Sequence, residues 1–391
     1  MKLAVIVQRY GEEVIGGAEL HARWIAQRLA ALHQVSVLTT CAVEYLTWEN
    51  RYDPGPSTVG GLPVLRFPVA RRRTPEGFDA LSSKVHFFDH SDAEERRWME
   101  EHGPVTPGLL EHLRAHHGDY DALIFFSYRY WTAYHGLQVA PHKSILVPTA
   151  EDDGAVRLRI FRDYFPRAAA LAFNSHEERE LLLSVTGARD LPGEIVGVGI
   201  EDTDVVSPDA IRRRLDVLGD YIVYVGRIER EKGCSRLFED FVRFVQERAP
   251  QLNLVLVGKA VLEVPIHVNI RHLGVLSDAE KLSVIGASRA LVHPSAFESL
   301  SMALLEAWKM RRPALVNGRC AVMRGQVQRA GGGLYYVGYE EFRETLSRLL
   351  EQPDLADAMG RSGRAYFERH YAWDVVMEKY ERLLARVARA G

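Results

Sequence analysis

Short apolar runs alternate with longer amphipathic segments along almost the whole chain, and this alternation limits the fold most. Several runs are apolar at every position, which is typical of parallel strands covered on both faces. The repeated strand–helix order predicts βαβ architecture in two blocks. Strands are predicted at 2–8, 35–39, 63–67, 121–127, 144–149, 168–173 and 194–198, then at 221–226, 252–257, 269–273, 289–293, 313–317 and 334–337. Helices are predicted at 17–32, 175–186, 235–249, 298–310, 353–370 and 373–389.

A polar, acidic segment at 199–219 separates the two blocks. A chain of 391 residues is too long for one hydrophobic core, so two domains are expected. We predict α/β domains at 1–200 and 201–372, each with a doubly wound sheet. Ligands of such sheets bind outside the carboxyl ends of the strands, so we expect the two domains to face a central cleft.

Residues 41–116 fit this alternation poorly. The segment is aromatic, contains proline and glycine, and is rich in arginine, with three in a row at 71–73. We interpret it as an irregular insert that either lines a variable binding site or forms solvated surface.

Composition and termini exclude several classes of function. The formal net charge of −3 argues against a nucleic-acid partner. Three scattered cysteines, Cys41, Cys234 and Cys320, lack metal-ligand spacing and predict reduced thiols. The N-terminus does not resemble a signal peptide, and no stretch approaches 18 apolar residues. We therefore expect a cytoplasmic protein, with peripheral membrane contact left open by the arginines at 71–73.

The run VGRIEREKG at 225–233 places two cations around a turn that follows a predicted strand. Gly226 allows a close backbone approach, and Gly233 allows the turn into the next helix. Arg227 offers a planar fork of donors and Lys232 a compact charge, so together they could stabilise a departing diphosphate. A solvated turn is the alternative, because the run also carries two acids.

Two carboxylates, Glu298 and Glu306, lie eight positions apart after the predicted strand at 289–293. We predict that Ser299 caps a helix whose free amides near Leu300 and Ser301 suit a phosphate group. In helical phase the two carboxylates lie roughly 80° apart and could accept hydrogen bonds from the hydroxyls of one extended ligand. The spacing alone also occurs in many helices by chance.

Two further loops carry polar groups after predicted strands. Gly16 and Gly17 would expose backbone amides at a helix start, which suits an anion, although a plain helix N-terminus is the alternative. Glu151, Asp152 and Asp153 could position an acceptor hydroxyl, bind a metal or cap the next helix. Capping by Asp152 or Asp153 is favoured, and no second acidic cluster supports a metal site.

Together these motifs resemble the retaining glycosyltransferases of family 4, which have the GT-B fold. The resemblance covers essentially the full chain and includes the first glycine loop, the GR-x4-KG turn, the E-x7-E element, the segment LGVLSDAEK at 273–281 and the ending YFERHYAWDVV. It implies two Rossmann-like domains, with a terminal helix at 373–391 that packs back on the first.

The resemblance implies how such an enzyme would treat the donor diphosphate. The residues that would bind it are Gly16, Gly17, Arg227, Lys232, Leu300 and Ser301. Family members work without a divalent metal or another cofactor. Retention is usually explained by front-face attack, in which the leaving phosphate accepts the proton of the acceptor, so no protein nucleophile is required.

The same resemblance assigns the rest of the donor site. Glu298 would hold hydroxyls of the transferred sugar, and it joins Arg227 and Lys232 as a candidate catalytic residue. Glu306 would bind the ribose. The base would lie near Gly274 and Val275, held largely by main-chain contacts.

The acceptor side departs from the family pattern. Many relatives carry a histidine in stretches that here contain FFSYRYW and PTAEDDG, where Ser127, Tyr128 and Glu151 stand instead. Glu151 and Tyr128 are candidate acceptor contacts. The aromatic segment around Trp48 is a candidate acceptor wall, or simply packing for the insert.

We therefore predict a metal-independent retaining hexosyltransferase that uses a UDP- or GDP-sugar donor. The acceptor would be a hydroxyl of a glycan, a lipid-linked molecule or a small molecule. One alternative is an idle nucleotide-sugar-binding partner subunit, against which the complete set of four charged donor residues argues. Another is a nucleotide-sugar epimerase, which would process the donor with no acceptor present.

Overall fold

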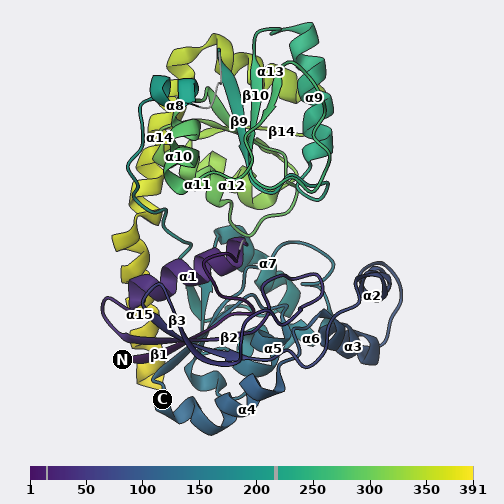
Figure 1. Ribbon diagram of the computed structural model, residues 1–391, viewed down its shortest axis with the longest axis vertical. Coiled ribbons are helices and arrows are strands. Elements are labelled where there is room, and N and C mark those ends of the chain that lie inside the picture. The colour runs from purple at the N-terminus through teal and green to yellow at the C-terminus, as the bar shows by residue number, and fades with distance from the viewer. Residues whose placement is uncertain (15, 215–218, 391) are drawn as a thin grey trace. The chain divides into compact units, whose positions relative to one another are not determined.

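The computed structural model describes residues 1–14, 16–214 and 219–390. Residues 215–218 of the polar segment and Gly391 of the predicted terminal helix lie outside the described residues. The chain forms two compact units, Met1–Val198 with Val376–Gly391, and Gly199–Val375. Figure 1 shows the helices and strands of both units. The predicted α/β class with two parallel-sheet domains is confirmed.

The first unit is built on an eight-stranded sheet in the order β3-β4-β2-β1-β5-β6-β7-β8. Its strands are β1 (Lys2–Ile6), β2 (Gln34–Thr40), β3 (Gly55–Val59), β4 (Leu62–Phe67), β5 (Ala122–Phe126), β6 (Ser144–Val147), β7 (Ala170–Phe173) and β8 (Gly193–Ile195). Neighbours pair in parallel except β3 and β4, which are antiparallel. The central strand β5 (ALIFF) is buried at every position, as its continuously apolar sequence predicts.

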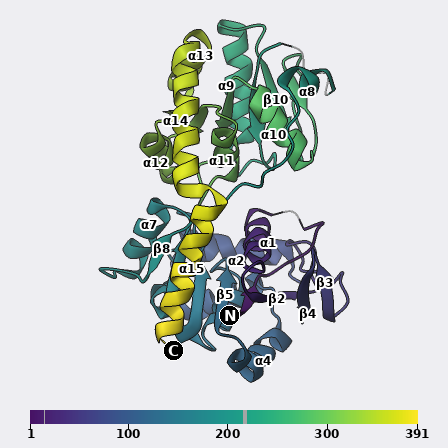
Figure 2. The same ribbon diagram turned by 90° about the vertical axis from the view of Figure 1, so that its left-hand side faces the viewer.

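Helices and short 3₁₀ turns connect these strands. They are α1 (Gly17–Leu29), α2 (Pro75–Phe87), α3 (Asp92–His102), α4 (Pro107–His116), η1 (His117–Asp119), α5 (Trp131–Leu137), η2 (Pro141–Lys143), α6 (Arg159–Arg162), η3 (Phe165–Arg167) and α7 (His176–Thr186). The last helix, α15 (Trp373–Ala390), belongs to this unit from Val376 onward. It lies beside β8 (Figure 2), where Arg382 pairs with Glu194.

The segment 41–116 is more regular than the sequence suggested, and the prediction of an irregular insert is wrong. It contains β3, β4 and the three helices α2, α3 and α4. Helix α3 is highly charged but begins with a capping box between Ser91 and Glu94, and it buries Trp98 and Met99. The helical period of α3 is weak in the sequence because this helix has few apolar residues.

The second unit has a six-stranded, fully parallel sheet in the order β11-β10-β9-β12-β13-β14. Its strands are β9 (Tyr221–Val225), β10 (Asn253–Val257), β11 (Ile270–His272), β12 (Ala290–His293), β13 (Ala314–Asn317) and β14 (Gly333–Tyr336). Its helices are α8 (Pro208–Arg214), α9 (Cys234–Glu247), α10 (Asp278–Ala287), α11 (Met302–Lys309), α12 (Ala321–Ala330), α13 (Tyr339–Glu351) and α14 (Pro353–Tyr371).

Both faces of this second sheet are covered. Ile222 and Tyr224 of β9 share a core with Phe241 of α9 and Phe342 of α13. Val223, which points to the opposite face because strand side chains alternate, is also fully buried. The strand order reverses between β9 and β12. The carboxyl ends of these two neighbours therefore form a topological switch point, where such sheets bind ligands.

Candidate functional site

The turn after β9 packs directly on the loop after β12. Gly233 has a φ of +77°, and a Cβ at this position would lie 2.5 Å from the carbonyl oxygen of Pro294. Only glycine tolerates both the backbone conformation and this close approach. The cationic turn and the acidic loop are thereby joined at the switch point of the second unit.

Lys232 and Glu298 form an ion pair across this junction. The Nζ atom of Lys232 lies 2.7 Å from Oε1 of Glu298, with side chains 27% and 11% exposed. Arg227 lies in the same turn, with Nε 3.1 Å from Oε2 of Glu229 and a side chain that is 41% exposed. The structure thus brings together the three residues that the sequence indicated as catalytic candidates, and leaves a guanidinium open to solvent beside the pair.

His293, at the end of β12, is a further residue of this site that the sequence motifs above do not include. Its Nε2 lies 3.8 Å from Oε1 of Glu298, and its ring meets Tyr224 edge to face. Burial lowers the pKa of His293 to about 4, although the charge of Glu298 raises it in part. The imidazole is therefore neutral at neutral pH. Its position as the last residue of an otherwise apolar strand was the available signal.

Tyr224 holds the cationic turn through a hydrogen bond. Its hydroxyl donates a hydrogen bond of 2.7 Å to the carbonyl oxygen of Arg227. Burial is the main reason why the pKa of this phenol is raised, so the hydroxyl keeps its proton and remains a donor.

The helix after Glu298 starts later than predicted. Helix α11 begins at Met302, and its N-cap is Ser301, whose hydroxyl accepts a hydrogen bond from the amide of Leu304 at 3.2 Å. The prediction of a cap at Ser299 is wrong, because Ser301 is the serine that satisfies an amide of the first turn. Glu298 therefore lies in the loop, so its helical-phase relation to Glu306 does not apply. Leu300 and Ser301 also precede the helix, and Ser301 is buried.

Glu306 lies in α11 and forms a second ion pair, in which its own side chain is buried. Its Oε1 lies 2.7 Å from Nζ of Lys281, and the same ammonium lies 2.7 Å from Oδ1 of Asp278. Burial raises the pKa of Glu306, and the charge of Lys281 opposes that rise. The sequence singled out Glu306 but missed Lys281, although SDAEK signalled a helix start that would place this lysine in its first turns.

The predicted base loop is tied to the cationic turn through the main chain. The amide of Gly258 donates a hydrogen bond of 2.8 Å to the carbonyl oxygen of Gly274. A Cβ at Gly258, whose φ is +136°, would lie 2.0 Å from the carbonyl oxygen of Gly226. The loops after β9, β10 and β11 therefore meet, and Val275 is exposed at their edge.

Gly16 and Gly17 lie in the first unit, at the start of α1, whereas the other predicted diphosphate residues lie in the second. Gly16 is the N-cap and Gly17 is exposed. A Cβ at Gly16 would lie 2.1 Å from Oε2 of Glu19. That carboxylate is buried against Arg9, whose Nη2 lies 2.5 Å from Oε1. The helix start therefore holds a charge-compensated carboxylate.

Two candidate acceptor residues are interior side chains. Trp48 is 1% exposed, and its Nε1 donates a hydrogen bond of 2.7 Å to the carbonyl oxygen of His102. Tyr128 is also 1% exposed and packs edge to face against Phe161. Both assignments are corrected on this ground, because a side chain without accessible surface cannot line an acceptor site in this structure.

The acidic loop after β6 keeps one accessible candidate. Glu151 is half-buried there. Asp153 caps the following turn, since its Oδ1 accepts hydrogen bonds from the amides of Ala155 and Val156 at 3.0 and 3.2 Å. No group of three or more His, Cys, Asp or Glu residues is placed to hold a metal ion within the described ranges. The described helices also include none with an apolar stretch long enough to cross a membrane.

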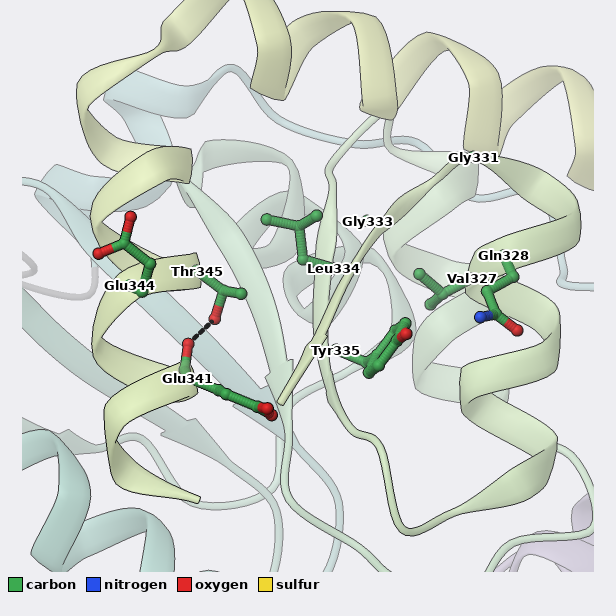
Figure 3. Close-up of a pocket in the computed structure, with 9 residues that line it drawn as sticks. All are labelled: Val327, Gln328, Gly331, Gly333, Leu334, Tyr335, Glu341, Glu344 and Thr345. Carbon is green, nitrogen blue, oxygen red and sulfur yellow. Dashed lines mark hydrogen bonds between the residues drawn. The ribbon is translucent and has the colours of Figure 1, made fainter. Parts of the chain in front are cut away.

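An open pocket lies elsewhere in the second unit, beside the edge strand β14 (Figure 3). Gly333, Leu334 and Tyr335 line it from the strand, with Glu341 and Thr345 from α13. It contains none of the residues that the sequence indicated for the donor.

Comparisons with known proteins agree with this geometry. Residues 213–366 match the sequence profile of the family described as glycosyl transferases group 1. The chain is 25% identical over 186 residues to glycosyltransferase 1 domain-containing protein 1 of Xenopus tropicalis, which covers 44% of this chain and 52% of that protein. The chain thus spans about half the length of this curated relative.

Two solved structures resemble the whole chain. Sucrose-phosphate synthase of Thermosynechococcus elongatus matches with a TM-score of 0.73 and 16% identity, covering 100% of both chains. HepE of Anabaena, in complex with UDP and glucose, matches with a TM-score of 0.69 and 15% identity, covering 98% of this chain and 100% of that chain.

The chain has the GT-B fold, with two Rossmann-like units. Its second unit carries the match to glycosyl transferases group 1 over residues 213–366, and the resemblance to this class that the sequence indicated is confirmed.

Proposed function

We propose that the protein is a metal-independent, retaining glycosyltransferase that transfers a hexose-type sugar from a UDP- or GDP-sugar to an acceptor hydroxyl. The observation that carries this proposal is the ion pair between Lys232 and Glu298 at the switch point. A nucleotide-sugar offers a partner for each group: its phosphates for the ammonium and its sugar hydroxyls for the carboxylate. The structure of HepE with UDP and glucose supports a nucleotide-sugar donor.

The charges of the site suit the breaking of a glycosyl–phosphate bond. As that bond breaks, negative charge grows on the departing diphosphate, and Arg227 and Lys232 stabilise it. Two side-chain cations can supply charge that a divalent metal supplies in other enzymes. Glu298 would hold the sugar hydroxyls, and Glu306 the ribose. The amides at the start of α11 add a favourable dipole for the phosphate group.

Retention follows if the acceptor attacks the anomeric carbon from the face that the diphosphate leaves. The bond from the acceptor oxygen to the anomeric carbon forms while the bond to the phosphate oxygen breaks. The phosphate oxygen takes the proton of the acceptor hydroxyl. No protein nucleophile takes part, so the described residues need only bind, orient and stabilise charge.

The test is donor turnover without free metal. Purified protein is incubated in EDTA with UDP-, GDP-, ADP- and dTDP-sugars, alone and with a panel of sugar and lipid-linked acceptors, and released nucleoside diphosphate is measured. Selective release from a UDP- or GDP-sugar supports the proposal. A strict requirement for Mn²⁺ would contradict the metal-free mechanism. If no donor is bound in thermal-shift measurements and none is turned over, the assignment fails.

A further inference from the structure

Lys281 is mostly buried and forms an ion pair with Glu306, the second carboxylate of the site. Its side chain is 15% exposed and that of Glu306 is 5% exposed, and their charged atoms lie 2.7 Å apart. Asp278, which is half exposed, holds the same ammonium from the start of α10 at 2.7 Å. The lysine is therefore clamped between a surface carboxylate and a buried one.

The backbone that carries Lys281 is fixed. Helix α10 begins with a capping box, in which Ser277 and Glu280 bond each other's backbone amides. Glu280 is also paired with Arg214 of α8. The cap follows the predicted base loop directly, since Ser277 stands two positions after Val275. Helix α10 therefore links the base loop to the carboxylate of Glu306.

The charge of Glu306 depends on this lysine. A buried carboxylate without a cationic partner becomes neutral, because desolvation disfavours its charged form. Burial raises the pKa of Glu306, Lys281 opposes that rise through charge and hydrogen bonding, Asp278 adds to it, and Lys309 opposes it through charge alone. Lys309 is held elsewhere, by the carbonyl oxygens of Ile200 and Glu201 and by Asp202.

An ionised carboxylate can serve both ribose hydroxyls at once. It offers about four acceptor positions on two oxygens, so one can hold Lys281 while the others accept from two neighbouring hydroxyls. A protonated carboxyl group accepts fewer hydrogen bonds, because one of its oxygens carries a hydrogen that acts as a donor. Ionisation and orientation of Glu306 are therefore both needed for two hydroxyl contacts.

We propose that Lys281 is a positioning residue for nucleotide recognition, which keeps Glu306 ionised and oriented toward the two hydroxyls of a ribose. This inference rests on the proposed function, in which Glu306 faces the ribose of the donor. Lys281 lies outside the E-x7-E element. In this role it sets the preference for ribose over deoxyribose, which a lysine with a purely structural role would not affect.

The test compares the affinities of UDP and 2′-deoxy-UDP, and of GDP and 2′-deoxy-GDP, by titration calorimetry between pH 6 and pH 9. The variants are Lys281→Met, Lys281→Gln, Lys281→Arg and Glu306→Gln. Arg236→Met is the matched control, because it removes the cation beside another buried carboxylate, Asp240, that has no proposed part in binding. The ratio of the two affinities cancels phosphate titration, which both ligands share.

We expect the wild-type protein, Arg236→Met and Lys281→Arg to favour the ribonucleotide by about tenfold, the value of one good hydrogen bond to a charged group. Glu306→Gln should lose most of that preference at every pH. Lys281→Met should lose it progressively as the pH falls, because removal of the cation raises the pKa of Glu306. If Lys281→Met does not fold, Lys281→Gln gives the same readout, since it also removes the charge.

The possible failures are separable. If Glu306→Gln abolishes the ribose preference and both uncharged Lys281 variants keep it at every pH, the positioning role is overturned while the proposed function stands. If Glu306→Gln itself keeps the preference, the assignment of Glu306 to the ribose fails, and this inference fails with it. If neither nucleotide pair binds, the donor site of the proposed function is refuted first.

Discussion

Nζ of Lys232 and Oε1 of Glu298 lie 2.7 Å apart, although 66 positions separate the two residues in the chain. Parallel pairing of β9 with β12 places their loops side by side, and the missing side chain of Gly233 lets the loops touch. In the proposed complex, the diphosphate of the nucleotide-sugar would bind Lys232 and its sugar hydroxyls would bind Glu298. Donor binding would therefore exchange one ion pair for two new sets of contacts.

Removal of either cation should slow turnover strongly. We expect Lys232→Ala and Arg227→Ala each to lower kcat by on the order of 10²-fold, because each removes charge stabilisation worth about 3 kcal/mol. Arg230→Ala is the control, since Arg230 is exposed in the same turn and has no proposed contact with the donor. Steady-state release of nucleoside diphosphate measures the effect. Near-normal kcat in both site variants would refute the assignment.

Neutralising Glu298 should change two affinities in opposite directions. In Glu298→Gln the ammonium of Lys232 loses its ion pair with this carboxylate, so free nucleoside diphosphate should bind more tightly, by about 1 kcal/mol or roughly fivefold. The nucleotide-sugar should lose part of its affinity advantage over the free nucleotide, because a neutral amide accepts weaker hydrogen bonds from the sugar hydroxyls than a carboxylate does. Titration calorimetry with both ligands measures this. Glu231→Gln, an exposed change in the same turn, should alter neither affinity, and equal losses of both ligands in Glu298→Gln would contradict the exchange.

Gly233 should be irreplaceable for two reasons that a matched variant separates. Alanine at a left-handed backbone position costs about 1–2 kcal/mol, and at Gly233 the added Cβ would also collide with Pro294. Gly331 has a φ of +57°, but the nearest atom to an added Cβ is 3.7 Å away. We expect Gly331→Ala to lower Tm modestly and leave nucleotide affinity intact. Gly233→Ala should lower both Tm and nucleotide affinity. If the two variants change Tm and affinity by the same amounts, the contact between the loops is unimportant.

His21 should make the first unit sensitive to acid. Burial lowers the pKa of this histidine to about 3 from its ordinary 6.5, so the unfolded chain binds the extra proton first. Between these values the free energy of unfolding should fall as the pH falls, by up to about 1.4 kcal/mol per pH unit. His21→Asn should flatten that slope, whatever its absolute stability, and the exposed His142→Asn should not. Urea unfolding at several pH values measures it, and an unchanged slope in His21→Asn would disprove the attribution.

Sequence patterns captured the features that follow from local chemistry. Strands such as β5 and β9 are apolar at nearly every position, so their type and burial could be predicted. Gly233 predicted a turn because glycine readily adopts a backbone conformation with positive φ. The charged residues at the strand ends were also recognisable, since charge is rare next to buried strands.

Features that depend on tertiary packing escaped prediction. Two serines two positions apart could each have capped α11, and only the helix start distinguishes Ser301 from Ser299. Trp48 is buried against Ala42, Val69 and Tyr130, which only the tertiary fold brings together, and Arg73 lies over its ring. Lys281 faces Glu306 because α10 packs on α11, a contact between residues 25 positions apart that periodicity cannot show.

The main-chain junction of Gly226, Gly258 and Gly274 has a consequence for redesign. Because the three loops are joined through backbone groups, the shape of this junction does not depend on the side chains that point outward from it. Positions such as Val275 can therefore be randomised without dismantling the scaffold. Under the proposed function, a small library at this rim would vary nucleotide preference separately from folding.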